Sequence, residues 1–328
     1  VKAFLLAGEP SGDALAAALM AGLKDQAPGV AFEGVGGPRM QAQGLESLFP
    51  MEELSVMGIA EILPKYRHLM RRIQLTAAAV IAAKPDVLIT VDSPDFCLRV
   101  AKRVKAVSDI RGVHYVAPTV WAWRPERAPK MAKVVDHVLA LFPFEPPYME
   151  DAGMECDFVG HPIAAEPQVT PEELATFRET HALGDAPQIV VLPGSRNSEI
   201  ERLLPIFAEA LARSGQADTP ILLPTLSHLE PTVRKFESGL KAPVTFVTGR
   251  GLSSAAAARE RRVAMAAADL AVAASGTVSL ELAAAGTPMV IAYDMNWLSR
   301  QIIQRKLLID TVTLVNIISE TRAVPEFI

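Results

Sequence analysis

Short apolar runs alternate with helical segments along the whole chain, and this alternation constrains the fold more than any other feature. The runs have the length of buried parallel strands, and the segments between them have helical length and patterning. Such alternation predicts a parallel, doubly wound sheet. In the first half the predicted strands are Lys2–Ala7, Asp86–Val91, Gly112–Val116, His137–Leu141 and Cys156–Val159, and the predicted helices are Ser11–Gln26, Lys65–Lys84, Phe96–Val107 and Pro125–Val135.

A polar segment with prolines, Ala164 to Pro171, interrupts this pattern, which then starts again. We therefore predict an α/β protein with two Rossmann-like doubly wound domains, residues 1–163 and 164–328. Ligands of such sheets bind outside the carboxyl ends of the strands, and we expect the two edges to face each other across a cleft. The later strands are predicted at Gln188–Leu192, Pro220–Pro224, Val244–Val247, Asp269–Ala274 and Pro288–Tyr293, and the later helices at Ser198–Arg213, Glu230–Phe236, Ala257–Ala266 and Thr277–Ala285.

Composition narrows the class of protein. A chain of 328 residues exceeds the size at which one core stops growing, and half of its residues are apolar. The net charge of −5 argues against a nucleic-acid partner. Cys97 and Cys156 fit no metal or CxxC spacing, so we expect free thiols in a reducing, cytoplasmic compartment. The sequence predicts no membrane-spanning helix, no metal site and no cofactor.

The first predicted strand is followed directly by Gly8-Glu9-Pro10-Ser11-Gly12-Asp13, which opens a helix. Glycines permit a tight turn, and a helix start offers free N–H groups and a positive dipole end. Ser11 and Gly12 are therefore candidates to bind a phosphate or a sugar hydroxyl. The alternative is that Ser11 or Asp13 only caps the helix. The turn is not GxGxxG, which argues against a dinucleotide.

A second turn, Asp92-Ser93-Pro94-Asp95-Phe96, follows the strand Asp86–Val91. Pro94 ends the strand and favours the first helical position, which puts Asp95 in the first turn of the helix. A carboxylate at this edge can accept the proton of an attacking hydroxyl, so Asp95 is the candidate catalytic base. The alternative, at least as strong for Asp92, is that both aspartates cap the helix.

The segment His114–Arg124 brings aromatic residues to a strand end. It contains Trp121 and Trp123, two of the three tryptophans of the chain, and finishes with Arg124. Such a segment can stack on a sugar or flank an acyl chain. The alternative is a hydrophobic corner with its polar atoms satisfied.

Two strand-to-helix turns of the second half suit a diphosphate. In Leu192-Pro193-Gly194-Ser195-Arg196, Gly194 permits close backbone approach, Ser195 donates, and Arg196 can pair bidentately with phosphate oxygens.

The second of these turns, Ser275-Gly276-Thr277, opens a helix whose free amides can hold a phosphate. Glu281 follows about one turn later and can accept both hydroxyls of a ribose. A carboxylate on this otherwise apolar helix is costly unless it is paired or functional. Gly286 is expected to end the helix.

One segment has the character of a membrane contact. Its apolar residues are Val56, Met57, Ile59, Ile62 and Leu63, and a basic cluster with Lys65, Arg67, His68, Arg71 and Arg72 follows. Apolar residues beside basic ones suit an interface with anionic lipid. The alternative is an ordinary helix with a buried stripe.

Taken together, these motifs resemble the lipid-A-disaccharide synthase family over essentially the whole chain. The matching stretches are AGEPSGD (7–13), FEGVGGPRM (32–40), VMGIAEILP (56–64), VDSPDF (91–96), HYVAPTVWAWRPER (114–127), LFPFE (141–145), FVGHP (158–162), LPGSR (192–196), ASGTVSLELAAAGTPMV (274–290), VNII (315–318) and VPEFI (324–328). The combination is far more specific than any one motif.

The resemblance implies an inverting glycosyltransferase with two Rossmann-like domains of the GT-B type. It implies transfer of a diacylglucosamine from UDP to the 6-hydroxyl of diacylglucosamine 1-phosphate, at the inner face of the Gram-negative inner membrane. The protein would be cytoplasmic and peripheral on that membrane, and the sequence is compatible with a homodimer. By position, the implied residues are Asp95 for catalysis, Ser195 and Arg196 for the diphosphate, Ser275, Gly276, Thr277 and Glu281 for UDP, and Asn316 in the matching late segment.

Family members continue beyond the VPEFI stretch with a further Gln and a last helix, so we expect the chain to be cut at Ile328, and also at Val1, which is not Met. Three other functions fit parts of the pattern. One is another UDP-N-acetylglucosamine transferase or epimerase on the same scaffold. The second is a non-catalytic nucleotide- or lipid-binding fragment. The third, a dehydrogenase, lacks its GxGxxG turn.

Overall fold

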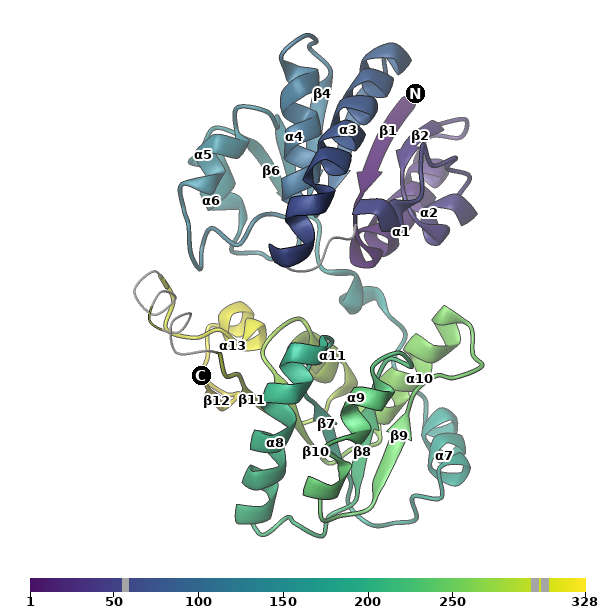
Figure 1. The fold of residues 1–328 in the computed structure, drawn as a ribbon, viewed down its shortest axis with the longest axis vertical. Helices are drawn as coiled ribbons and strands as arrows, with labels where there is room; N and C mark the ends of the chain where they lie inside the picture. The colour runs from purple at the N-terminus through teal and green to yellow at the C-terminus, as the bar shows by residue number, and fades with distance from the viewer. Residues whose placement is uncertain (55–58, 296–300, 302–306) are drawn as a thin grey trace. The chain divides into compact units, whose positions relative to one another are not determined.

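The structure is a computed structural model that describes residues 1–328 except 55–58, 296–300 and 302–306 (Figure 1). Its internal contacts divide the chain into two compact units, Val1–Pro162 and Ile163–Ile328. Each unit is an α/β sheet with helices on its faces, so the predicted fold of two Rossmann-like domains is confirmed.

Over its described residues, the first unit contains a six-stranded parallel sheet in the order β2-β1-β3-β4-β5-β6. The strands are β1 (Lys2–Ala7), β2 (Ala31–Val35), β3 (Val87–Val91), β4 (Arg111–Tyr115), β5 (His137–Ala140) and β6 (Glu155–Phe158). The helices are α1 (Pro10–Gln26), α2 (Pro38–Ala42), α3 (Ile59–Ala83), α4 (Pro94–Lys105), α5 (Arg127–Met131) and α6 (Pro146–Glu150), with 3₁₀ turns η1 (Met51–Leu54) and η2 (Pro162–Ala165).

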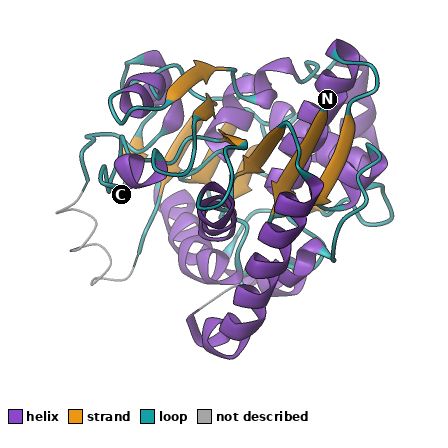
Figure 2. Ribbon diagram, turned by 90° about the horizontal axis from the view of Figure 1, so that it is seen from above, coloured by secondary structure: helices purple, strands orange, loops and turns teal. Residues whose placement is uncertain are grey.

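The core of this unit follows from the period of two along its strands. Phe4 and Leu6 of β1 point to one face of the sheet, where they pack in one cluster with residues of α3 and α4. Ile73 of α3 and Val100 of α4 are fully buried in that cluster. Figure 2 shows helices on both sides of the strands, as a doubly wound sheet requires.

The edge strand β2 was not predicted from the sequence pattern, and neither were α2, α6, α7 (Pro171–Thr180), α13 (Leu314–Ser319) and β12 (Glu326–Phe327). Glu33 and Gly34 interrupt its apolar run, which hid the strand from a search for continuous hydrophobicity. The glycine is required by packing, because a Cβ at Gly34 would lie 1.8 Å from the carbonyl oxygen of Leu5 on β1. The close approach of the β1 and β2 backbones therefore requires glycine at position 34.

Over the described part of the second unit, the sheet order is β12-β11-β10-β7-β8-β9, again all parallel. The strands are β7 (Ile189–Leu192), β8 (Ile221–Pro224), β9 (Val244–Val247), β10 (Leu270–Ala274), β11 (Met289–Ala292) and β12 (Glu326–Phe327). The helices are α7 (Pro171–Thr180), α8 (Asn197–Arg213), α9 (Glu230–Arg234), α10 (Ser254–Ala266), α11 (Val278–Ala285) and α13 (Leu314–Ser319), with the 3₁₀ turn η3 (Glu237–Gly239).

Alternate residues of the central strand β7 bury against different helices. Ile189 and Val191 belong to the cluster that contains the apolar face of α8, whereas Val190 and Leu192 belong to the cluster of α10 and α11. Both faces of the strand are therefore covered, which explains why it reads as a continuous apolar run.

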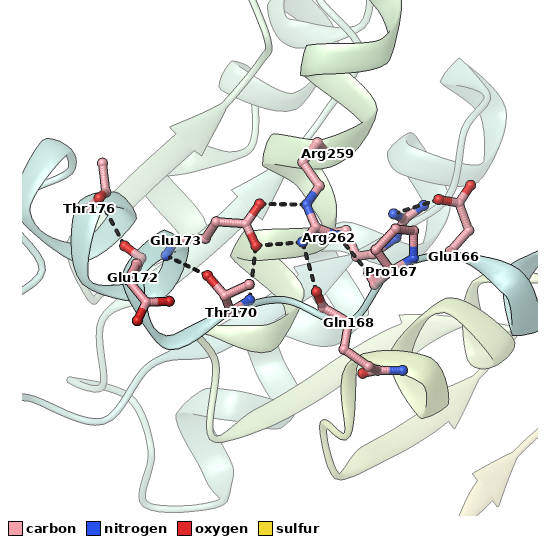
Figure 3. Close-up of polar contacts among 9 residues, drawn as sticks. All are labelled: Glu166, Pro167, Gln168, Thr170, Glu172, Glu173, Thr176, Arg259 and Arg262. Atoms are coloured by element: carbon pink, nitrogen blue, oxygen red, sulfur yellow. Dashed lines mark hydrogen bonds and ion pairs between the residues drawn. The ribbon is translucent and has the colours of Figure 1, made fainter.

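The segment that enters the second unit is fixed to α10 by Arg259 and by Arg262, which pairs with Glu166 at 3.0 Å (Figure 3). Arg259 donates to the carbonyl oxygens of Pro167 (2.7 Å) and Gln168 (2.9 Å) and pairs with Glu173. Glu173 also completes a capping box with Thr170 at the start of α7. These donors hold the pKa of Glu173 down at about 2, because they stabilise the charged carboxylate.

Each sheet has one position where the direction of winding reverses. In the first unit it lies between β1 and β3, which pair from Ala3–Val87 to Ala7–Val91. In the second it lies between β7 and β10, where Leu192 is next to Ala273. Such switch points open a crevice outside the carboxyl ends of the strands, and ligands bind there.

Candidate active site

The switch point of the first unit brings the two predicted turns together. The chain leaves β1 at Gly8 and β3 at Asp92, and a Cβ at Gly8 would lie 2.8 Å from the hydroxyl oxygen of Ser93. Glycine at position 8 therefore leaves room for this hydroxyl. The Ser93 oxygen is buried and has no hydrogen-bond partner among the described residues, so it is a donor without an acceptor.

The turn after β3 has an unusual backbone. Asp92 and Ser93 have φ values of 50° and 43°, in the left-handed region that non-glycine residues rarely enter. Pro94 then occupies the first helical position of α4, and Asp95 lies exposed in the first turn, as predicted. Neither aspartate is the N-cap of α4, which is Ser93. Two consecutive strained residues beside an exposed carboxylate are typical of a functional site.

A pocket of about 300 Å³ lies at this switch point. Asp95 and Arg99 of α4 line it together with Ser93 and the Gly8 turn, and its apolar lining comes from Leu54, Tyr66, Leu69 and Phe96. Its volume is at the lower limit of about 300–1,000 Å³ for small-molecule sites, which suits a monosaccharide.

Ser11 and Gly12 lie at the start of α1. Ser11 is exposed, and Gly12 packs so closely that a Cβ would lie 3.2 Å from the carbonyl oxygen of Val91. The alternative that Ser11 or Asp13 caps α1 is wrong, because α1 has Glu9 as N-cap and no side-chain cap. The buried carboxylate of Asp13 instead accepts hydrogen bonds of 2.9–3.0 Å from the N–H groups that begin α2.

The aromatic segment after β4 forms a corner of the same unit. Trp121 is buried and meets Phe144 edge to face at 5.0 Å, and Phe142 stacks on both Phe144 and His161. Trp123 is more accessible, with the Arg124 guanidinium 4.1 Å from its ring centroid. For Trp121, the structure supports the hydrophobic-corner alternative.

Glu145 lies at the centre of this corner and was not identified from the sequence. Its carboxylate accepts hydrogen bonds from the N–H groups of Leu141 and Phe142, both 3.0 Å, and from the Trp121 indole at 3.3 Å. Burial nevertheless raises its pKa to about 7, since desolvation outweighs these three donors. The sequence feature that could have identified Glu145 is its position, an acidic residue four positions after the predicted buried strand His137–Leu141.

In the second unit, the turn after β7 is held by its own helix. Gly194 has a φ of 119°, and a Cβ there would lie 2.5 Å from the Glu199 carboxylate. That carboxylate accepts from the Ser195 N–H at 3.0 Å and from the Arg196 guanidinium at 3.1 Å. Ser195 and Arg196 are both exposed, and Glu199 orients the arginine.

The turn after β10 lies beside it, because β7 and β10 are neighbours. Gly276 has a φ of 150°, and Gly276 and Thr277 are exposed while Ser275 is half-buried. Among the described residues, the N–H groups of Thr277 and Val278 have no hydrogen-bond acceptor. The structure thus brings the two predicted phosphate turns together at one switch point.

Glu281 and Asn316 both have polar partners within the protein. Glu281 lies in the first turn of α11, where its Oε2 pairs with Arg261 at 2.8 Å, so the charge is compensated. Asn316 is fully buried, and its amide bonds the backbone N–H and carbonyl of Val324 at 3.0 and 2.9 Å. Asn316 therefore fixes the turn before β12, and its predicted part in substrate binding stays a prediction.

The predicted membrane contact lies outside the described residues: Val56 and Met57 are among those omitted, and the side chains of Ile59, Ile62 and Leu63 are not described. Within the described ranges, no helix is both long and apolar enough to cross a bilayer. The same ranges contain no cluster of three or more metal-ligating side chains.

Two Rossmann-like units with crevices at their switch points define the fold class, which is the GT-B fold. Solved structures of this fold include the UDP-GlcNAc 2-epimerase of Methanocaldococcus jannaschii in complex with UDP-GlcNAc and UDP (TM-score 0.62, 13% identity, 100% of this chain and 89% of that one). The UDP-GlcNAc 2-epimerase of Neisseria meningitidis is similar (TM-score 0.60, 12% identity, 98% and 90% covered). At these identities the likeness shows the fold alone.

Sequence comparison gives the family. Residues 3–328 match the family described as lipid-A-disaccharide synthetase. The lipid-A-disaccharide synthase of Ruegeria pomeroyi is 60% identical over 328 residues, covering 99% of this chain and 82% of the relative. That of Rhodospirillum centenum is 45% identical, covering 99% and 80%. The chain belongs to the lipid-A-disaccharide synthase family, whose members are glycosyltransferases.

Proposed function

We propose that this chain moves a diacylglucosamine from UDP to the 6-hydroxyl of diacylglucosamine 1-phosphate and so forms the lipid A disaccharide with inversion. The single observation that carries the proposal is the family match over residues 3–328. The site geometry supports it, because phosphate-binding turns occupy one switch point and an exposed carboxylate in a pocket occupies the other.

The second unit, residues 164–328 by the predicted boundary, binds the UDP-sugar. Its diphosphate accepts hydrogen bonds from the N–H groups of Thr277 and Val278 and from the guanidinium of Arg196. Ser195 and Ser275 add hydroxyl donors beside them. When the anomeric carbon–oxygen bond breaks, the leaving diphosphate gains charge, and these fixed donors stabilise it. Glu281 uses Oε1 for the ribose hydroxyls while Oε2 keeps its pair with Arg261.

The first unit binds the acceptor sugar, and Ser11 and Gly12 at the start of α1 contribute to the same edge. Asp95 accepts the proton of the 6-hydroxyl as that oxygen attacks the anomeric carbon from the side opposite UDP. A new carbon–oxygen bond forms as the bond to the diphosphate breaks, so the configuration inverts. Asn316 acts indirectly, by fixing the turn between α13 and β12.

The acyl chains of both substrates need an apolar surface, and the segment with Val56, Met57, Ile59, Ile62 and Leu63 supplies it at the inner membrane face. In the chain, this segment lies between Leu54 and Tyr66, which line the pocket. Serine at several of these positions is expected to release the protein from vesicles containing anionic lipid. Unchanged co-sedimentation of the serine variant with vesicles would reject the contact.

The reaction is tested by incubating the protein with UDP-diacylglucosamine and diacylglucosamine 1-phosphate and analysing the products by mass spectrometry. The expected products are UDP and a tetra-acylated disaccharide 1-phosphate with a β linkage, and the Asp95→Asn variant is the matched control. Release of free diacylglucosamine, or a donor sugar epimerised at C2, would contradict the proposal.

A further inference from the structure

The wall of the pocket that α4 forms carries two opposite charges. Asp95 and Arg99 are four residues apart, both are exposed, and both line the pocket. Residues at this spacing lie on the same face of a helix, about 6 Å apart along its axis. The carboxylate and the guanidinium therefore stand one above the other along one side of the cavity.

The two charges do not neutralise each other. Within the described residues, the guanidinium of Arg99 makes no ion pair. Its Nη1 donates a weak hydrogen bond of 3.9 Å to the sulfur of Met70. Other arginines near the two switch points are paired: Arg72 with Glu53 at 2.6 Å and Arg261 with Glu281 at 2.8 Å. Among the described residues, Arg99 is thus a cation at the pocket without an ion-pair partner, although Glu9 also lines the pocket.

The rest of the pocket suits the sugar between these charges. Among the described residues, the buried hydroxyl of Ser93 has no hydrogen-bond partner, and Ser93 lines the pocket together with Asp95 and Arg99. Leu54, Leu69 and the ring of Tyr66 form an apolar side. With a volume of about 300 Å³, the pocket accommodates a sugar headgroup, whereas long acyl chains must extend out of it.

We propose that Arg99 binds the anomeric phosphate of the acceptor while Asp95 contacts its 6-hydroxyl, so that this pair selects a phosphorylated acceptor and sets its orientation. The inference rests on the proposed function. In a hexose the C1 and C6 substituents lie on opposite sides of the ring oxygen, a separation comparable to the one helical turn between the two residues. A guanidinium is suited to a phosphate because its planar donors match the oxygens bidentately.

The test compares acceptors with and without the phosphate. The probes are a short-chain diacylglucosamine 1-phosphate and the same sugar without phosphate, assayed with wild type, Arg99→Gln and the control Lys102→Gln, which removes an exposed charge from the same helix outside the pocket. Arg99→Gln is expected to raise KM for the phosphorylated acceptor about ten- to hundredfold and to leave KM for the donor unchanged. It should turn over the unphosphorylated acceptor as wild type does, and Lys102→Gln should behave as wild type with both.

If Arg99→Gln keeps the wild-type preference for the phosphorylated acceptor, the inference is wrong even though the proposed reaction stands. Binding separates the two further, by titrating both acceptors into Asp95→Asn and into Asp95→Asn with Arg99→Gln. A phosphate preference that depends on Arg99 in this binding assay, without turnover by wild type, would support the inference and reject the reaction. A preference that is equal in both variants would overturn the inference.

Discussion

The two switch points differ in how their turns are made. In the second unit, the residues with positive φ beside the site are Gly194 and Gly276, for which this backbone carries no steric cost. In the first unit, Asp92 and Ser93 adopt φ values near 50° without being glycines. Left-handed backbone costs such residues about 1–2 kcal/mol each, so the first unit retains strain that the second avoids.

The difference corresponds to two kinds of chemistry. Glycine turns expose backbone N–H groups at a helix start, which suits a diphosphate that needs several fixed donors. The strained turn instead places residues with polar side chains, Ser93 and Asp95, in the lining of a pocket. We therefore expect one switch point to bind an anion and the other to move a proton.

The largest expected effect is on the carboxylate of the first unit. Asp95→Asn removes the base, so kcat should fall about 10²- to 10⁴-fold. UDP affinity should remain unchanged, because the diphosphate is proposed to bind at the other switch point. Steady-state kinetics together with UDP titration measure both quantities. Near-wild-type turnover would show that Asp95 is not the base. It would also contradict the assignment of proton transfer to the first unit and anion binding to the second.

The next effect concerns the pH dependence of stability in the first unit. Because the folded-state pKa of Glu145 is raised from 4.5 to about 7, the folded protein binds the proton more tightly than the unfolded chain, and stability falls as pH rises across that window, by on the order of 3 kcal/mol. Above about pH 7 the contribution is constant.

Urea denaturation of wild type and of Glu145→Gln between pH 5 and pH 8 measures this effect. The variant should lose the fall in stability between pH 5 and pH 7, whereas Glu150→Gln, an exposed neighbour on α6, should keep it. A parallel pH dependence in wild type and Glu145→Gln would show that this carboxyl does not titrate as described.

A smaller effect is expected at the anion site of the second unit. Arg196→Gln removes a charged donor, so kcat/KM for the UDP-sugar should fall about ten- to hundredfold. The turn should stay folded, because Glu199 keeps its hydrogen bond from the Ser195 N–H. Arg213→Gln, at the other end of α8, is the control and should be neutral. Equal kinetics for both variants would remove Arg196 from the donor site.

The smallest effect tests the strained turn itself. Ser93→Gly relieves left-handed backbone and removes a buried hydroxyl without a partner, so unfolding free energy should rise by about 1 kcal/mol. Ser93→Ala removes only the hydroxyl and separates the two contributions. Both should lower turnover if the hydroxyl contacts the acceptor. A destabilised Ser93→Gly protein would show that the turn is not strained.

Much of the fold followed from local patterns in the sequence. The run at Ile189–Leu192 is apolar on both faces because helices cover both. A buried parallel strand can therefore be predicted from its continuous apolar sequence. Pro94 placed Asp95 in the first turn of α4, and Gly286 ends α11 with a φ of 74°, both as predicted. Strand β2 was not predicted because Gly34 interrupts its apolar run. This glycine is needed because the carbonyl oxygen of Leu5, distant in the sequence, leaves no room for a side chain.

The partners of the site residues could not be predicted, because they come from other parts of the chain or from within a turn whose geometry is set by packing. Glu281 pairs with Arg261, twenty residues earlier, and Asp13 binds the start of α2, more than twenty residues later. Asn316 was assigned to substrate binding from its motif, and its hydrogen bond to Val324 could not be predicted from the sequence. Arg99 could be identified as a candidate binding residue only from its position in the pocket lining.

The assignment of anion binding to the second unit and proton transfer to the first is tested most directly by a crystal structure of the protein with UDP bound. The diphosphate is expected within hydrogen-bond distance of the Thr277 and Val278 N–H groups and the Arg196 guanidinium, with the ribose at Glu281. If UDP instead occupies the pocket beside Asp95 and Arg99, or lies away from Arg196 and Glu281, the anion site has been assigned to the wrong unit and the account fails.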